Sequence, residues 1–186
     1  MTGVQTCALP IYETALQNIL YTAQLGLDHP IAIRYPRGRG VIQDWQTQHL
    51  GKYKKIAIGK SICIKQGSKI AVLSNGTIGN NVSLAVAKIK HPETIAHYDF
   101  PFVKPLDESA LHIIFKTYPT IITIEDGTVK GGFGSAILEF ASENNYTSKI
   151  TVLGIPDEFI EHGTVAELQH YCGIDVKSIE QLFSSF

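Results

Sequence analysis

Two arginines stand three residues apart in the segment Arg34-Tyr35-Pro36-Arg37-Gly38. Arg34 lies near the end of the apolar run 31–35, which Pro36 closes and which we expect to be a buried strand. Open α/β sheets place ligands at the carboxyl ends of their strands. Two guanidinium groups beside a glycine could hold a phosphate through paired hydrogen bonds. Spacing alone nevertheless favours a surface ion pair or an interdomain salt bridge, because arginines with structural roles are common.

A second candidate is the glycine-rich loop that runs from Glu125-Asp126-Gly127 to Gly131-Gly132-Phe133-Gly134. Backbone N–H groups at the start of the following helix could hold an anion. The glycines could equally permit a tight turn and close helix–sheet packing. We favour packing, because the spacing matches neither the dinucleotide fingerprint nor the P-loop. The same two interpretations apply to Asn75-Gly76-Thr77-Ile78-Gly79, where we favour a turn and a helix cap.

Other arrangements of reactive residues are not supported. Glu125 and Asp126 are adjacent on an expected strand, so their carboxylates should point to opposite faces. The seven histidines form no i, i+4 pair with a carboxylate on an expected helix, which argues against a metal site. Cys7, Cys63 and Cys172 make no CxxC pair and fit a reducing cytoplasm. These patterns give no catalytic residue, no cofactor ligand and no metal ligand.

The overall composition sets limits on the partners. The chain has 186 residues, of which 44% are hydrophobic, and a net charge of -1. This length and apolar content suit one folded domain with a short remnant of another. The small net charge argues against a nucleic-acid partner. No apolar stretch is long enough to span a bilayer, so we expect no membrane partner.

Expected strands and helices alternate along most of the chain. A helix from Glu13 precedes the strand at 31–35, and residues 37–54 show no clear period. The later strands are expected at 61–65, 69–73, 94–100, 120–125 and 149–153, and the later helices at 77–90, 132–144 and after Asp107, Thr164 and Asp175. This order predicts a three-layer α/β sandwich with a mostly parallel sheet. The turn at 66–68 is too short for a parallel crossover, so one edge strand should be antiparallel.

The first residues differ from the rest of the chain. Residues 1–11 carry no charge and no pattern that continues into the helix that follows. The string TGVQTCALPI resembles a translated sequencing adapter, and the basic region of a signal peptide is missing. We therefore expect residues 1–12 to be a non-native leader.

Several segments in a fixed order carry a family resemblance. In chain order they are residues 34–38, 58–60, 102–107, 123–126 with 131–135, and 154–157 with 163–164. From about residue 13 onward, this set resembles the C-terminal third of the 1-deoxy-D-xylulose-5-phosphate synthases. The resemblance implies that residues 13–40 are the end of a pyrimidine-binding domain, that 41–52 are a linker, and that 53–186 form a transketolase C-terminal-like domain.

The resemblance also implies a function for the full-length parent. These synthases are cytoplasmic homodimers that use thiamine diphosphate and magnesium. They condense pyruvate with glyceraldehyde 3-phosphate and release carbon dioxide, and their product feeds isoprenoid, thiamine and pyridoxal synthesis. The first arginine of the matching segment lies near the substrate phosphate in this family, which implies that role for Arg34. Arg37 is implied as a second phosphate-binding residue.

The chain lacks other parts of the family pattern. It has no GDG-type diphosphate segment, no magnesium ligand set and no activating glutamate, and Glu13 does not fit that last role. We therefore expect no bound cofactor and no activity from this chain alone. Two alternatives remain: the C-terminal domain of a transketolase or of a 2-oxo-acid dehydrogenase beta subunit, and a non-catalytic dimerisation module.

Overall fold

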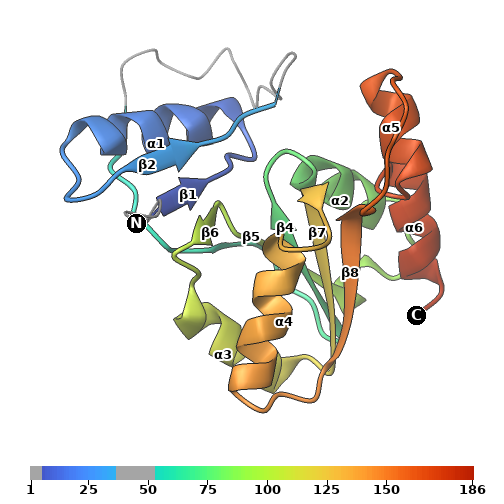
Figure 1. Cartoon of the computed structure of the whole chain (residues 1–186). Helices are drawn as coiled ribbons and strands as arrows, with labels where there is room; N and C mark the ends of the chain where they lie inside the picture. Colours follow the sequence, from blue (N-terminus) through green and yellow to red (C-terminus); the bar gives the residue numbers. More distant parts are fainter. Residues whose placement is uncertain (1–5, 37–52) are drawn as a thin grey trace.

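The computed structural model describes residues 6–36 and 53–186, which form two β-sheets and six α-helices (Figure 1). Arg37 and the expected linker at 41–52 lie outside the described residues. The strands are β1 (Thr6–Ala8), β2 (Ile31–Ile33), β3 (Ile62–Lys65), β4 (Ile70–Asn75), β5 (Ile95–Asp99), β6 (Phe102–Lys104), β7 (Thr120–Thr128) and β8 (Lys149–Ile155). The helices are α1 (Glu13–Gln24), α2 (Gly79–Val86), α3 (Glu108–Thr117), α4 (Phe133–Glu143), α5 (Val165–Tyr171) and α6 (Val176–Ser184).

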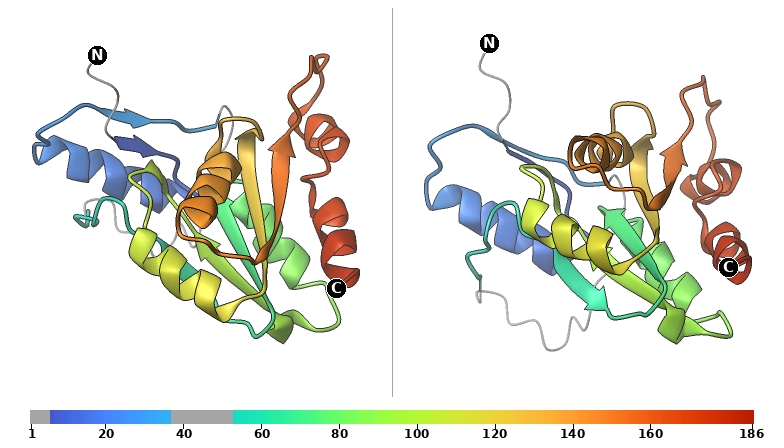
Figure 2. Two further views of the ribbon diagram at one scale, coloured as in Figure 1. Left: turned by 60° about the horizontal axis from the view of Figure 1, so that its bottom comes forward. Right: turned by 90° about the horizontal axis from the view of Figure 1, so that it is seen from below.

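The larger sheet has the strand order β3-β5-β4-β7-β8, and helices cover both of its faces (Figure 2). On one face, α3 and α4 pack through Leu111 and Ile137 against β4, β5 and β7. On the other face, α2 and α6 pack through Val82 and Ile179. The strand β4 pairs in parallel with β5 and β7, and β7 pairs in parallel with β8. The expected three-layer sandwich with a mostly parallel sheet is therefore confirmed.

The edge strand β3 is antiparallel, as expected, but its neighbour differs from the expectation. The short turn at 66–68 suggested that β3 and β4 lie side by side, whereas β5 lies between them and pairs with both. The turn crosses directly over the start of β5. A Cβ atom on Gly67 would lie 2.1 Å from the backbone carbon of Ile95, so only glycine lets the two backbones pass this closely.

The expected helix starts are confirmed by their caps. The carboxylates of Asp107 and Asp175 each accept a hydrogen bond from a backbone N–H in the first turn of the helix that follows. Thr164 and Glu167 form a reciprocal capping box at the start of α5. Such caps satisfy backbone donors that the helix itself leaves unpaired. Within the described ranges, no helix has both the length and the apolarity that a membrane span requires.

The smaller sheet joins the N-terminal segment to the rest of the molecule. Its order is β2-β1-β6, with β1 parallel to β2 and antiparallel to β6. Beneath α1, Ala8, Ile19 and Phe102 form a separate apolar cluster. The sequence patterns did not predict β1 or β6, because neither three-residue segment is a continuous apolar run like that of β2. The non-native origin of residues 1–12 stays a prediction, since so short a pairing can form on backbone hydrogen bonds alone.

A buried histidine links β5 to β4 and α2. His97 is 1% exposed, and its Nε2 lies 2.8 Å from the Ser74 hydroxyl. Its Nδ1 lies 3.3 Å from the hydroxyl of Ser83 on α2. Burial lowers the pKa of His97 to about 4, so the ring stays neutral where an exposed histidine would be charged.

This low pKa predicts acid sensitivity. Between the unfolded pKa near 6.5 and the folded pKa of about 4, only the unfolded state takes up the proton. The free energy of unfolding should therefore fall with decreasing pH across that window, by on the order of 3 kcal/mol from this group. Urea unfolding of the wild type and of His97→Gln, at several pH values, measures the effect. The wild type should be the more stable protein at neutral pH and should lose that advantage towards pH 4. A stability difference that is independent of pH would contradict the assignment.

Candidate functional site

A groove of about 680 Å³ opens at the carboxyl ends of β2, β4, β7 and β8. Arg34, Thr77 and Asp126 contribute polar atoms to it, and α5 supplies an apolar wall. Within the sheet, β4 has β5 as its neighbour on one side and β7 as its neighbour on the other. The chain thus adds strands first on one side of β4 and then on the other. The groove thus lies beside the point where the strand order reverses, which is where open α/β sheets usually bind ligands.

Arg34 follows β2 directly and reaches from the smaller sheet to the larger one. Its backbone N–H donates to the carbonyl of Ala8, which extends the pairing of β1 with β2. Its guanidinium donates to the backbone carbonyl of Asp126 at 3.0 Å. The acceptor is a neutral carbonyl, so the positive charge of Arg34 is not cancelled by this contact. Among residues 6–36 and 53–186, Arg34 forms neither of the ion pairs that spacing alone favoured, and a phosphate-binding role for Arg34 stays a prediction.

The glycine-rich loop after β7 holds an anion that belongs to the chain itself. The Glu125 carboxylate accepts hydrogen bonds from Phe133 N at 2.9 Å and from Gly134 N at 2.8 Å. These N–H groups open α4, where the helix dipole favours a negative charge. A Cβ atom on Gly132 would lie 2.3 Å from the same carboxylate. The glycines therefore allow close packing of this turn, as the sequence analysis favoured.

The turn after β4 also serves packing. Gly76 has a φ of 79°, a conformation that glycine adopts without strain. The side-chain amide of Asn75 is buried and donates to the carbonyl of Phe100 at 2.6 Å. These contacts fit the favoured interpretation of a turn. Gly76 and Thr77 nevertheless line the groove, so the turn shapes one of its walls.

The wall of the groove formed by α5 was not predicted from the sequence. Val165, Leu168 and Cys172 line the groove from α5 and its end. Burial raises the pKa of the Cys172 thiol, with further contributions from the nearby carboxylates of Asp126 and Glu158, so a reactive thiolate is disfavoured here. The capping box at Thr164 predicted that a helix begins here. No local sequence pattern indicates that this short, unburied helix lies opposite the end of β7, which is far away in the sequence.

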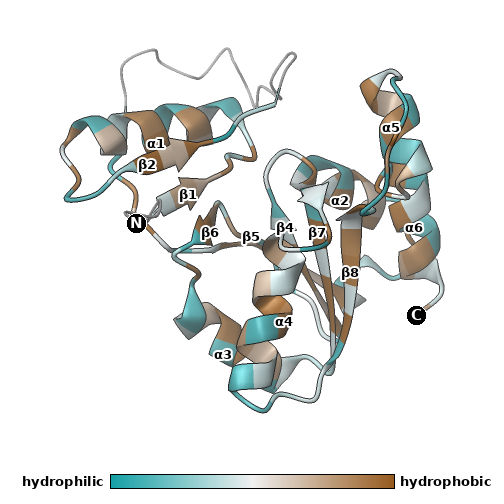
Figure 3. Cartoon of the chain, in the orientation of Figure 1, coloured by the Kyte–Doolittle hydropathy of each residue, from teal (hydrophilic) through white to brown (hydrophobic). Residues whose placement is uncertain are grey.

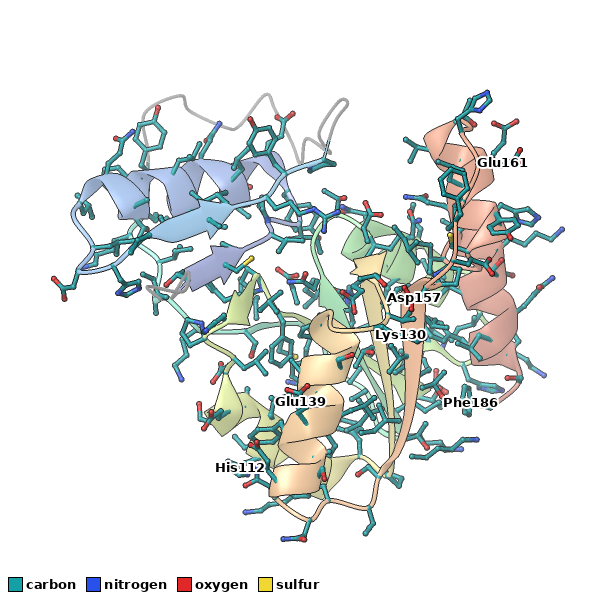
Figure 4. The ribbon with its side chains drawn as sticks, in the orientation of Figure 1. His112, Lys130, Glu139, Asp157, Glu161 and Phe186 are labelled. Carbon is teal, nitrogen blue, oxygen red and sulfur yellow. The ribbon has the colours of Figure 1, made fainter. Side chains whose placement is uncertain are left out.

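Two acidic side chains, Asp126 and Glu161, also line the groove. Figure 4 labels Glu161 in the segment that leads to α5, together with Lys130 and Asp157 beyond the ends of β7 and β8. Lys130 and Asp157 form an ion pair at 3.0 Å, and both side chains are largely exposed. Such exposed pairs contribute little to stability. Arg34 is the cationic side chain that the described part of the chain places in the groove wall.

The described residues do not fit a centre of thiamine diphosphate and magnesium. Across residues 6–36 and 53–186, no cluster of three or more His, Cys, Asp or Glu side chains could hold a metal ion. The helix start after the glycine-rich loop is already neutralised by Glu125. A diphosphate group would therefore meet a carboxylate there rather than free N–H donors.

The family model described as "Transketolase, C-terminal domain" matches residues 59–179. The chain is also 47% identical over 176 residues to the 1-deoxy-D-xylulose-5-phosphate synthase of Bacteroides thetaiotaomicron. That match covers 94% of this chain and 27% of the relative. The corresponding synthase of Cytophaga hutchinsonii is 48% identical over 172 residues, which cover 91% of this chain and 26% of the relative. The chain thus spans about a quarter of the length of these curated relatives, and the resemblance seen in the ordered segments is confirmed.

Solved structures support the fold. A split-gene transketolase, described as an inactive beta4 tetramer, has a TM-score of 0.81 at 20% identity and covers 97% of this chain and 57% of its own. The transketolase of Campylobacter jejuni has a TM-score of 0.60 at 14% identity and covers 97% of this chain and 26% of its own. At these identities the likeness concerns the fold alone, and it confirms the expected transketolase-type architecture.

The contact between Glu125 and α4 yields a prediction about stability. Glu125→Gln removes the charge and one of the two acceptor oxygens, so the free energy of unfolding should fall by about 2 kcal/mol. Asp126→Asn is the matched control, because Arg34 bonds the carbonyl of residue 126 and not its carboxylate. The control should change stability by less than about 0.5 kcal/mol. Urea unfolding measures both variants, and equal losses would show that Glu125 does not hold the helix start.

Proposed function

Since the chain belongs to the transketolase C-terminal domain family, we propose that it is the C-terminal part of a 1-deoxy-D-xylulose-5-phosphate synthase. The full-length enzyme condenses pyruvate with glyceraldehyde 3-phosphate to 1-deoxy-D-xylulose 5-phosphate and carbon dioxide. The observation that carries the proposal is the 47% identity to a synthase of that name over 94% of the chain. The product would serve isoprenoid, thiamine and pyridoxal synthesis in the cytoplasm.

The chain alone would be inactive. Thiamine diphosphate and magnesium belong to the proposed full-length enzyme, which is a homodimer, and the described residues here do not fit them. One structural neighbour supports the inactivity, since the split-gene transketolase chain that shares this fold is described as an inactive tetramer. The contribution of this chain would be to bind the substrate and to complete the assembly.

Arg34 would hold the phosphate of glyceraldehyde 3-phosphate. It lines the groove at the strand ends, and its charge is not neutralised by its contact with the Asp126 carbonyl. Arg37 would be a second contact. The rest of the groove wall includes the apolar surface of α5 and the acidic side chains of Asp126 and Glu161, so the anion would bind directly at Arg34, the cation of this wall.

The two alternatives have less support. Transketolases share the fold at 14–20% identity, whereas the synthases reach 48%. These comparisons offer no sequence identity that would favour a 2-oxo-acid dehydrogenase subunit over a transketolase. A non-catalytic dimerisation module would leave the groove at the strand ends without a use.

Purified chain provides the first test. With pyruvate, glyceraldehyde 3-phosphate, thiamine diphosphate and magnesium, we expect no formation of 1-deoxy-D-xylulose 5-phosphate above background. The Bacteroides thetaiotaomicron synthase, assayed in parallel, controls for the conditions. Measurable turnover by this chain would refute the proposal that it is inactive without the rest of the enzyme.

A chimera provides the second test. Residues 13–186 would replace the matching segment of the Bacteroides thetaiotaomicron synthase, and we expect an active enzyme. In this chimera, Arg34→Ala should raise the KM for glyceraldehyde 3-phosphate by about tenfold or more, because a charged hydrogen bond to phosphate is lost. The KM for pyruvate and the activity with unphosphorylated glyceraldehyde should stay unchanged.

Lys130→Ala serves as the control, because that cation lies outside the residues that line the groove and should leave every constant unchanged. An inactive but folded chimera would contradict the proposed function. An equal loss with glyceraldehyde and with its phosphate would instead show that Arg34 acts only by joining the two sheets.

A further inference from the structure

A second cavity of about 400 Å³ lies beneath α1, where the helix faces the strands β3 and β5. It is separate from the groove at Arg34, and the two share no lining residue. Its walls are largely apolar, with Ala15 and Ile19 from α1, Ile62 from β3 and Phe102 from β6. Figure 3 shows that α1 carries hydrophobic residues along its length, between more hydrophilic ones. This volume falls within the range of about 300–1,000 Å³ that is usual for small-molecule sites.

One residue with an acidic side chain, Asp99, is among the residues that line this cavity. Asp99, at the end of β5, is 1% exposed, and neither of its oxygens has a hydrogen-bond partner among residues 6–36 and 53–186. The other buried carboxylates are well satisfied. Asp107 accepts bonds from Ser61, Ser109 and the ammonium of Lys60, and Glu125 accepts two backbone N–H bonds. Since an unpaired buried polar group is costly, Asp99 stands out as a group that could serve a ligand.

The charged and titratable groups around the cavity do not satisfy Asp99. Lys60 lines the same cavity, but its ammonium bonds Asp107 at 3.0 Å and the Ser109 hydroxyl at 2.9 Å. His97, two residues earlier on β5, is neutral and lies within bonding distance of two serine hydroxyls. Tyr12 contributes to the wall from the residue before α1. Burial raises the pKa of Asp99 to about 8, so its carboxyl is mostly protonated at neutral pH.

We propose that this cavity binds a small organic amine, with the ammonium group paired to the Asp99 carboxylate and the carbon body packed between α1 and β3. An ammonium group supplies both the donors and the charge that a buried carboxylate needs. A divalent metal ion fits less well, because it requires several oxygen ligands and the cavity wall offers one carboxylate. An anionic ligand would be repelled once Asp99 ionises. The proposal does not depend on the synthase function.

Binding has a proton balance that can be measured. The free protein holds a proton on Asp99 at neutral pH, whereas the complex pairs an ionised carboxylate with an ammonium ion. The proton therefore passes from the carboxyl group to the buffer as the amine binds, and close to one proton should be released per site. No bond of the ligand is made or broken.

Isothermal titration calorimetry of the full 186-residue chain with benzylamine, in phosphate and in HEPES at neutral pH, tests the proposal. We expect saturable binding with an enthalpy that differs between the two buffers. Benzyl alcohol, which has nearly the same shape without the charge, should bind at least about tenfold more weakly. Asp99→Asn should weaken benzylamine binding by about tenfold or more and abolish the buffer dependence.

A second variant covers the possibility that Asp99→Asn does not fold. Ala15→Phe fills the cavity from α1 and leaves the carboxyl group in place, so it should also abolish binding. Three results would overturn the proposal: no binding of benzylamine to the folded wild type, binding to both folded variants that is as tight as binding to the wild type, or binding without proton release. The second of these would indicate attachment elsewhere on the surface.

Discussion

The Glu125 carboxylate holds the first turn of α4 against the carboxyl end of β7, and the arrangement of the groove depends on this contact. The strand β7 is paired on both sides, by β4 and by β8, so its end is fixed within the sheet. With Glu125 directed to α4, the next residue, Asp126, faces the groove and presents its carbonyl to Arg34. One carboxylate therefore sets the position of a helix, a loop and the acceptor for the arginine.

The two sheets are held together by a few contacts at their borders. Arg34 bonds across to Asp126, and β6 brings the chain of the larger unit into the smaller sheet. The small cluster of Ala8, Ile19 and Phe102 adds apolar contact beneath α1. By comparison, the cores on the two faces of the larger sheet contain many more residues. The N-terminal unit is thus joined to a larger body that has its own core, and both cavities lie where the two units meet.

Local chemistry explains what could be predicted from the sequence. The caps at Asp107, Thr164 and Asp175 and the isoleucine-rich strand β7 depend on neighbouring residues, and all four were expected where they occur. The neighbour of β3 was not predictable, because it depends on a crossing at Gly67 that no local pattern records. The acceptor of Arg34 is a backbone carbonyl, which any residue could provide. Among the described residues, Asp99 has no hydrogen-bond partner because of how separate segments pack around it, and no local sequence pattern indicates this.

The crossing at Gly67 constrains how the chain can reach this structure. A strand pair joined by a tight turn normally forms early, because its partners are close in the sequence. Here β3 and β4 are joined by such a turn, but β5 lies between them in the sheet, so they do not pair with each other. The strand β3 can join the sheet only through β5, so we expect it to be added after the centre of the sheet. A newly made chain would thus protect the β4–β7 centre from solvent exchange before the strand that precedes both in the sequence.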